Sequence, residues 1–296
     1  MHRPTTVELM LLATIVLWAL NLTVTRTILT HGFAPLAYAT VRYGLAALVF
    51  VALTLAAERT LRILRSDVPL TLVAALTIFL NQLAFVYALK TTTASTVALI
   101  LGATPIFAAL LGLALRTEAP SPRFWLGAVV SFAGVGLVAA GAGGIEGGFA
   151  GIALGVATAA TWAAYSVAIA PLMRRYSPSR ISALVLGLGW VPIALAGLPQ
   201  LARQDWALGW DIWGLLAFAT LGPLVLTNVL WFRSLHRIGP ARATLAANLQ
   251  PFVAAVFAVV LLSERMTALQ VAGGVLVALG ILVARRGGPL RVPRTE

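Results

Sequence analysis

The chain has 296 residues, of which 60% are hydrophobic and only 10% are charged. So few charged side chains cannot cover a water-facing surface, which excludes a soluble globular protein and indicates an integral membrane protein. The absence of cysteine excludes disulfide bonds and thiolate metal sites. The net charge of +12 comes from arginines that lie between apolar runs and at the C-terminus, where they orient membrane helices. We therefore expect a lipid bilayer as partner, and no nucleic acid.

A helix needs about 20 apolar residues to cross the hydrocarbon core of a bilayer. Ten stretches meet this length, and we predict a transmembrane helix over each: residues 8–30, 35–57, 68–89, 93–115, 123–141, 150–172, 181–199, 212–234, 240–262 and 268–285. The first run is too long for the h-region of a cleaved signal peptide, so we expect it to remain as an anchor. Placing the N-terminus in the cytoplasm leaves only Lys90, Arg203 and Arg265 outside, which predicts that both termini are cytoplasmic.

The two halves of the chain repeat one pattern. Pro105, Glu118, Gly127 and Gly134 return as Pro251, Glu264, Gly273 and Gly280, with 251 − 105 = 264 − 118 = 273 − 127 = 280 − 134 = 146. This constant offset indicates an internal duplication, with a first repeat at residues 1–145 and a second at residues 146–296. Each repeat has an odd number of spans, so the second enters the membrane in the opposite sense. The predicted fold is therefore an all-α integral membrane protein, with ten transmembrane helices in two inverted five-helix repeats, as in secondary transporters.

These segments also resemble a known family. LLSERMTALQVAGGVLVALGILV and LALRTEAPSPRFWLGAVVSFAGVGLV are similar to the end of the repeat in EamA-type transporters of the drug/metabolite transporter superfamily. TVRYGLAALV resembles the start of that repeat, and LNQLAFVYALKTTTASTVALILGATPIF resembles its middle. The resemblance implies a central cavity lined mainly by spans 1, 3, 4, 6, 8 and 9, and export of a small-molecule substrate without a cofactor. It is closest to bacterial aromatic and neutral amino acid exporters, which implies a multi-pass protein of the inner membrane, for which a monomer suffices.

Aromatic residues in mid-span are the first candidate substrate ligands. Trp18 and Asn21 in span 1 lie three residues apart on one helix face, and Trp162 and Tyr165 in span 6 repeat this spacing. The rings of Trp18, Trp162 and Tyr165, with that of Trp231 in span 8, are expected to form cavity walls that stack against an apolar or aromatic substrate. Ordinary helix packing is the alternative.

Side-chain amides are the second group, because they can bind both the ammonium and the carboxylate of a zwitterion. The candidates are Asn81 and Gln82 in span 3, Asn228 in span 8 and Asn248 in span 9. The offset relates Gln82 to Asn228, since 228 − 82 = 146. Hydrogen bonding between helices is the alternative for each of them.

Five further residues have predicted roles in the helix framework. Pro105 and Pro251 are expected to kink spans 4 and 9 and to act as hinges or gates. Arg42 could attract a carboxylate, but we interpret it as structural because span 2 is expected to lie outside the cavity. Glu264 and Glu118 are interpreted as structural, each a helix-dipole partner or a capping acceptor for the helix that follows it.

No aspartate or glutamate lies in the middle of a predicted span, which disfavours proton-coupled export of organic cations. No nucleophile with its base, metal set or carboxylate pair is visible at depth, so we predict that the protein is not an enzyme. The prediction is an uncoupled exporter of aromatic and other neutral amino acids that works by alternating access. The alternative is an exporter of another metabolite or drug, such as a nucleobase, a sugar conjugate or a hydrophobic compound, with proton coupling open.

Overall fold

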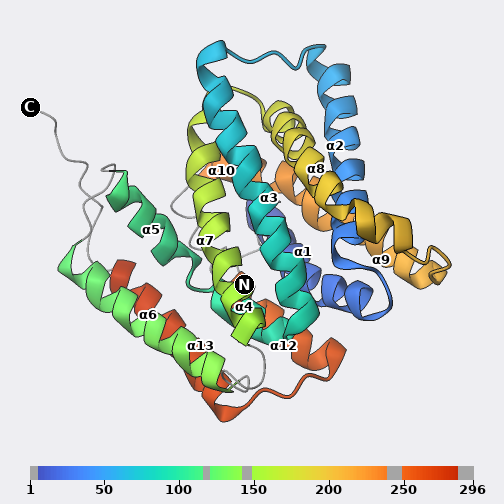
Figure 1. Cartoon of the computed structure of the whole chain (residues 1–296). Helices are drawn as coiled ribbons and strands as arrows, with labels where there is room; N and C mark the ends of the chain where they lie inside the picture. The colour runs from blue at the N-terminus through green and yellow to red at the C-terminus, as the bar shows by residue number, and fades with distance from the viewer. Residues whose placement is uncertain (1–5, 116–120, 142–148, 239–248, 286–296) are drawn as a thin grey trace, which may run out of the picture.

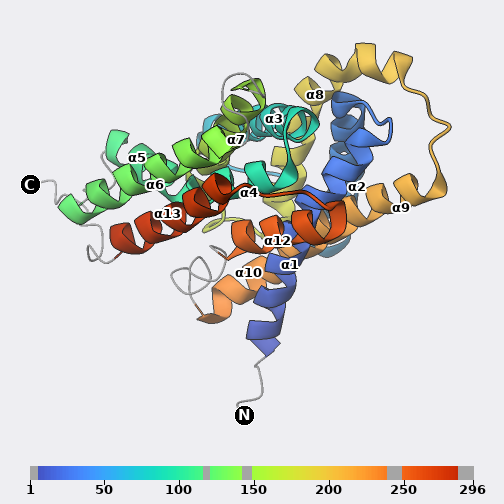
Figure 2. The ribbon, with the colours of Figure 1, turned by 90° about the horizontal axis from the view of Figure 1, so that it is seen from below.

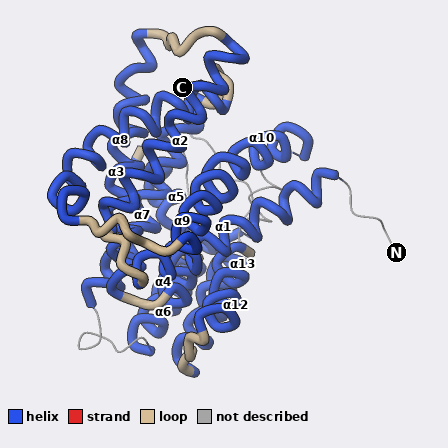
Figure 3. The backbone as a smooth tube through the Cα atoms, turned by 90° about the vertical axis from the view of Figure 1, so that its right-hand side faces the viewer, coloured by secondary structure: helices blue, strands red, loops and turns tan. Residues whose placement is uncertain are grey.

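A computed structural model describes residues 6–115, 121–141, 149–238 and 249–285. These residues form helices joined by loops (Figures 1 and 3). The helices are α1 (Thr6–Thr30), α2 (Pro35–Glu58), α3 (Val68–Thr91), α4 (Ala94–Leu101), α5 (Thr104–Ala114), α6 (Pro122–Gly141), α7 (Phe149–Leu172), α8 (Pro178–Arg203), α9 (Trp210–Thr220), α10 (Thr227–Ile238), α12 (Gln250–Leu262) and α13 (Ala268–Arg285). A 3₁₀ turn lies at Arg65–Asp67 and a π-helical turn at Leu221–Leu226.

Eight helical segments of the described chain are long and apolar enough to cross a membrane, with α4 and α5 together forming one segment, and α9 and α10 another. The helices α12 and α13 are apolar but shorter. The predicted limits agree closely with the structure: spans 35–57 and 150–172 correspond to Pro35–Glu58 and Phe149–Leu172. The prediction of an all-α membrane protein is confirmed.

Local sequence signals set the helix ends. Pro35 and Pro178 lie in the first turns of α2 and α8, where the missing N–H has no intrahelical partner to lose. The Ser177 side chain caps α8 by accepting a hydrogen bond from the Arg180 N–H at 3.1 Å. At its other end α2 stops at Arg59, which adopts a left-handed conformation with φ of 55°.

The contacts between helices follow an approximate two-fold symmetry. The helices α6 and α13 lie side by side at one edge of the molecule, and α2 packs on α8 towards the other (Figures 1 and 2). Between these edges α3 packs on α7, and α1 packs on α10. Under the 146-residue offset α6 corresponds to α13 and α2 to α8, so each edge pair joins a helix to its own counterpart. The central pair of α1 with α10 corresponds to the central pair of α7 with α3.

Glycines bring the backbones of α6 and α13 into direct contact. A Cβ added at Gly134 would lie 2.6 Å from the Gly273 carbonyl oxygen, and a Cβ added at Gly273 would lie 2.6 Å from that of Gly134. Between the same two helices, the Ser131 hydroxyl of α6 donates a hydrogen bond to the Val277 carbonyl of α13 at 3.2 Å. Such an approach requires residues without a side chain.

The second repeat caps a helix of the first. Glu264, in the loop between α12 and α13, accepts hydrogen bonds from the backbone N–H groups of Ala94 and Ser95 at 2.9 and 3.0 Å. It also accepts from the Ser95 hydroxyl at 2.7 Å. Glu264 is therefore a capping acceptor, but of α4 in the other repeat, and the prediction that it caps its own following helix was wrong. Glu118 lies outside the described residues.

Charged side chains join the two repeats at the ends of α2 and α7. Asp67 accepts hydrogen bonds from Arg175 Nη1 at 2.6 Å and from the Tyr176 hydroxyl at 2.7 Å. Glu58 binds Arg180, with Arg180 Nε donating at 2.8 Å, and also accepts from the Ser177 hydroxyl. These contacts link the α2–α3 loop to the α7–α8 loop.

The segment predicted as span 4 is interrupted. Its first part, α4, ends at Leu101, and Pro105 lies in the first turn of α5. A full break at Gly102 and Ala103 replaces the expected kink, because Pro105 supplies no N–H to continue the helical ladder. A Cβ added at Gly102 would lie 3.8 Å from the Cβ of Pro251, which occupies the first turn of α12. The two prolines therefore lie in the helices that meet at this break.

Candidate substrate site between the repeats

Trp18 connects α1 of the first repeat to α10 of the second. Its Nε1 donates a hydrogen bond to the Thr227 hydroxyl at 2.9 Å. The Trp18 ring also packs on Trp231, with ring centroids 5.2 Å apart. The structure thus brings two of the predicted aromatic ligands together across the repeats.

Asn81 makes the corresponding connection from α3 to α7. Its Nδ2 donates to the Thr158 carbonyl at 2.9 Å and to the Thr161 hydroxyl at 3.2 Å. Its Oδ1 accepts from Gln82 Nε2 at 3.2 Å. The other end of the Gln82 amide, Oε1, is buried and has no hydrogen-bond partner among the described residues. Gln82 therefore retains an unused acceptor.

Thr227 belongs to the candidate site, and sequence reasoning missed it. It occupies the position equivalent to Asn81, since 227 − 81 = 146, and each of the two binds the first helix of the opposite repeat. The repeat offset would have identified it. Asn228 is equivalent to Gln82, but its Nδ2 donates to the Leu224 carbonyl of its own helical segment at 2.9 Å. Asn228 therefore makes no contact between repeats through this nitrogen.

Trp162 and Tyr165 pair with each other on α7, with ring centroids 5.4 Å apart. Trp162 is 38% exposed, whereas Tyr165 packs against the buried core. Thr161, which binds Asn81, directly precedes Trp162 in the sequence, so this aromatic pair adjoins the contact between α3 and α7. Asn248 lies outside the described residues.

Asn21 lies on α1 beside Arg42 of α2, the arginine interpreted from the sequence as structural. Arg42 is only 3% exposed, and its Nη2 donates to Asn21 Oδ1 at 2.9 Å. The guanidinium carbon lies 5.8 Å from the centre of the Tyr38 ring and 6.0 Å from that of Tyr43. The Arg42 guanidinium therefore lies against the face of α1 that carries Asn21.

The second acceptor for Arg42 is a backbone carbonyl of the other repeat, four residues before a proline. Arg42 Nε donates to the Ala219 carbonyl at 3.2 Å. This carbonyl lies four residues before Pro223, which has no N–H to bind it, so the helical hydrogen bond that would occupy it is missing. Pro223 lies within the π-helical turn that separates α9 from α10. Turns of this kind are frequent at functional sites.

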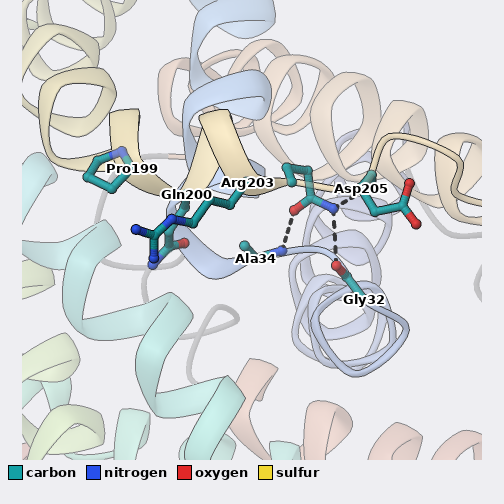
Figure 4. Close-up of a pocket in the computed structure, with 7 residues that line it drawn as sticks. Gly32, Ala34, Pro199, Gln200, Arg203 and Asp205 are labelled. Atoms are coloured by element: carbon teal, nitrogen blue, oxygen red, sulfur yellow. Dashed lines mark hydrogen bonds between the residues drawn. The ribbon is translucent and has the colours of Figure 1, made fainter.

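A cavity of about 360 Å³ lies apart from these residues, where the α1–α2 loop meets the end of α8 (Figure 4). Gln204 Oε1 accepts from the Ala34 N–H, and Gln200 Oε1 accepts from the Leu36 N–H, both at 2.7 Å. These glutamines satisfy backbone donors at the start of α2. Because their amide groups bind the protein itself, we assign them a structural role.

A second, apolar cavity of about 230 Å³ lies between α5 and α7. It is lined by Phe107, Leu110, Leu111, Ala160 and Ala164. None of the candidate substrate ligands lines either of these two cavities. The polar contacts described above therefore define the candidate site.

Comparison with known proteins agrees with this architecture. Residues 5–140 and 149–286 each match the EamA-like transporter family. The chain is 28% identical to a protein of Salmonella typhimurium (strain LT2) described as a probable amino-acid metabolite efflux pump, over 96% of this chain and 95% of that protein. It is 26% identical to YyaM of Bacillus subtilis (strain 168), described as an uncharacterized transporter, over 88% of this chain and 87% of that protein.

A solved crystal structure shows the same fold. It superposes with a TM-score of 0.66 at 20% identity, covering 96% of this chain and 98% of the other. The family matches span both halves of the chain and coincide with its apolar helices. The protein is therefore a multi-pass membrane protein that belongs to the EamA-like transporter family.

Proposed function

We propose that the protein exports aromatic and other neutral amino acids across the bacterial inner membrane by alternating access. In this proposal ten membrane spans form two inverted repeats, at residues 1–145 and 146–296, with both termini in the cytoplasm. The observation that carries the proposal is the contact of Trp18 with Thr227 and Trp231, which joins aromatic and polar groups of both repeats. Inverted-repeat transporters place their substrate between the repeats.

The packing of the helices supports the inverted arrangement. The helices α12 and α13 lie where spans 9 and 10 are predicted and are apolar, which supports adding them to the eight longer segments. The two edge pairs, each a helix with its own counterpart, are the contacts that a two-fold axis in the membrane plane produces. Pro105 and Pro251, beside the break between α4 and α5, are suited to act as hinges.

The side chains of the candidate site support an amino acid as the substrate. Tryptophan and tyrosine rings bury apolar or aromatic side chains, and amides hydrogen-bond charged groups of either sign. The Salmonella relative is itself described as a probable amino-acid metabolite efflux pump.

The carboxylates support uncoupled transport. Those of the described residues, Glu8, Glu58, Asp67, Asp205, Asp211 and Glu264, lie at helix ends or in loops. Proton coupling through a carboxylate would need such a group at the depth of the site.

Counterflow in proteoliposomes tests the proposal. Vesicles loaded with unlabelled phenylalanine should accumulate labelled phenylalanine from outside, with no effect of a protonophore. Trp231→Ala should abolish accumulation, whereas Trp125→Ala should not, because Trp125 is 45% exposed on α6 and lies outside the candidate site. Absence of accumulation by the folded native protein would contradict the amino acid assignment. Loss of accumulation with the protonophore would contradict uncoupled transport.

A further inference from the structure

The charge of Arg42 is buried without a counter-charge. Its contacts, to Asn21, the Ala219 carbonyl and two tyrosine rings, are all to neutral groups. The two ion pairs of the described residues join Arg175 to Asp67 and Arg180 to Glu58, at the loops, so neither involves Arg42. An arginine within a membrane span is costly and is retained where its charge has a use.

The guanidinium is also oriented with donors to spare. A guanidinium carries five N–H groups in a planar fork, and the bonds to Asn21 and Ala219 use two of them. The carbonyl that binds Nε is available because of Pro223, as described above. Two helices besides α2 thus fix the plane of a group that matches the geometry of a carboxylate.

The unused acceptor of Gln82 lies at a depth in the helix bundle similar to that of Asn21, the partner of Arg42. The ends of α1 and α3 are joined, because Arg26 Nη1 donates to the carbonyls of Leu89 and Lys90. Asn21 lies 26 − 21 = 5 residues before Arg26, and Gln82 lies 89 − 82 = 7 residues before Leu89. At a rise of about 1.5 Å per residue, both side chains lie roughly 8 to 10 Å below the joined ends.

From these observations we infer that Arg42 binds the carboxylate of the substrate and that Gln82 Oε1 accepts a hydrogen bond from its ammonium group. The transported molecule is then a zwitterion, and the side chain of the amino acid extends towards Trp18 and Trp231. Arg42 is a buried cation without a carboxylate partner, and Gln82 Oε1 is a buried acceptor without a donor among the described residues. At a similar depth, these two groups complement the carboxylate and the ammonium of such a molecule. This inference rests on the proposed function.

The experiment compares ligands that lack one of the two charged groups. Counterflow of labelled phenylalanine by the native protein is measured in competition with phenylalanine, phenylalaninamide, which lacks the carboxylate, and phenylpropionate, which lacks the ammonium. Phenylalanine should compete at a concentration about tenfold or more below that of either analogue, because each analogue loses a charge-assisted hydrogen bond. Equal competition by phenylalaninamide and phenylalanine would overturn the role of Arg42, whether or not any variant folds.

Variants assign the two groups. Arg42→Gln should raise the half-saturating concentration of phenylalanine about tenfold or more and remove the preference over phenylalaninamide. Gln82→Leu should remove the preference over phenylpropionate. Arg26→Gln is the matched control, because Arg26 is an arginine of the same bundle whose guanidinium binds carbonyls at the C-terminal end of α3, and it should keep both preferences.

If Arg42 only stabilises the packing of the helices, the variants should behave differently. Arg42→Gln would then lower the maximal rate and the thermal stability and leave the ratio between phenylalanine and phenylalaninamide unchanged, which would overturn the inference. Native protein that is folded but exchanges no phenylalanine contradicts the proposed function, and the inference fails with it. Native exchange without discrimination among the three ligands contradicts the inference alone.

Discussion

The Ser131 hydroxyl donates a hydrogen bond to the carbonyl of Val277, the residue at its own equivalent position, since 277 − 131 = 146. A residue that contacts its own counterpart lies on the axis that relates the two copies. That axis therefore passes between α6 and α13, and the contact of Gly134 with Gly273 lies close to it.

Gly134→Ala should destabilise the protein by about 1–3 kcal/mol, because the new Cβ would press on the backbone of α13. Gly273→Ala should have a similar effect from the other side. Gly136→Ala is the matched control on the same helix, since a Cβ there meets no atom within 4 Å. The measurement is the midpoint of thermal unfolding in detergent, followed by size-exclusion chromatography after heating. Equal midpoints for Gly134→Ala and Gly136→Ala would show that the close contact is absent.

Glu264→Ala should lower stability by roughly 1–2 kcal/mol, because α4 loses the acceptor of its first N–H groups. Glu264→Gln keeps one carbonyl oxygen and should be less severe. Arg265→Ala, a change at the neighbouring exposed residue, is the control. Hydrogen exchange at Ala94 and Ser95 provides the local measurement, and it should accelerate only in the Glu264 variants. Unchanged exchange in Glu264→Ala would refute the capping contact.

Trp18→Phe and Thr227→Val should be energetically coupled, because each removes one partner of the same hydrogen bond. A double-mutant cycle on thermal stability should give a coupling energy of about 1 kcal/mol. Trp18→Phe combined with Thr220→Val is the control pair, since the Thr220 hydroxyl bonds to the Leu216 carbonyl. Additive effects in the first pair would mean that the two side chains do not interact.

Glu58→Arg should destabilise the contact between the two loops by about 1–3 kcal/mol, because it places like charges beside Arg180. Adding Arg180→Glu should restore much of the loss by reversing the pair. Unfolding midpoints at low and high salt provide the test, since high salt should reduce the difference between the single and double variants. A double variant as unstable as the single one would show that the pair contributes nothing.

The sequence was sufficient for the positions of most helices, because long apolar runs bounded by arginine, proline and glycine leave few alternatives, but it did not reveal the break between α4 and α5 or the π-helical turn before α10. The four glycines of the repeat pattern, Gly127, Gly134, Gly273 and Gly280, all lie at the contact between α6 and α13. Hydrogen-bond partners on distant helices were harder to predict. Glu264 was assigned to the adjacent helix because its spacing in the sequence favours the nearest helix N-terminus, but it binds Ala94 and Ser95. The partner of Arg42 was missed for a related reason, since its acceptor is a carbonyl freed by Pro223 in the other repeat. Only the three-dimensional packing reveals such backbone acceptors.

The edge pairs, α2 with α8 and α6 with α13, have a thermodynamic consequence. For a carrier that alternates as proposed, exchanging the conformations of the two repeats maps each edge pair onto itself, whereas α1 with α10 and α3 with α7 trade roles. Both end states then contain nearly the same set of interactions, and the duplication itself keeps their free energies close. A carrier driven only by the concentration difference of its substrate requires this balance, because a large energy gap would trap it in one state.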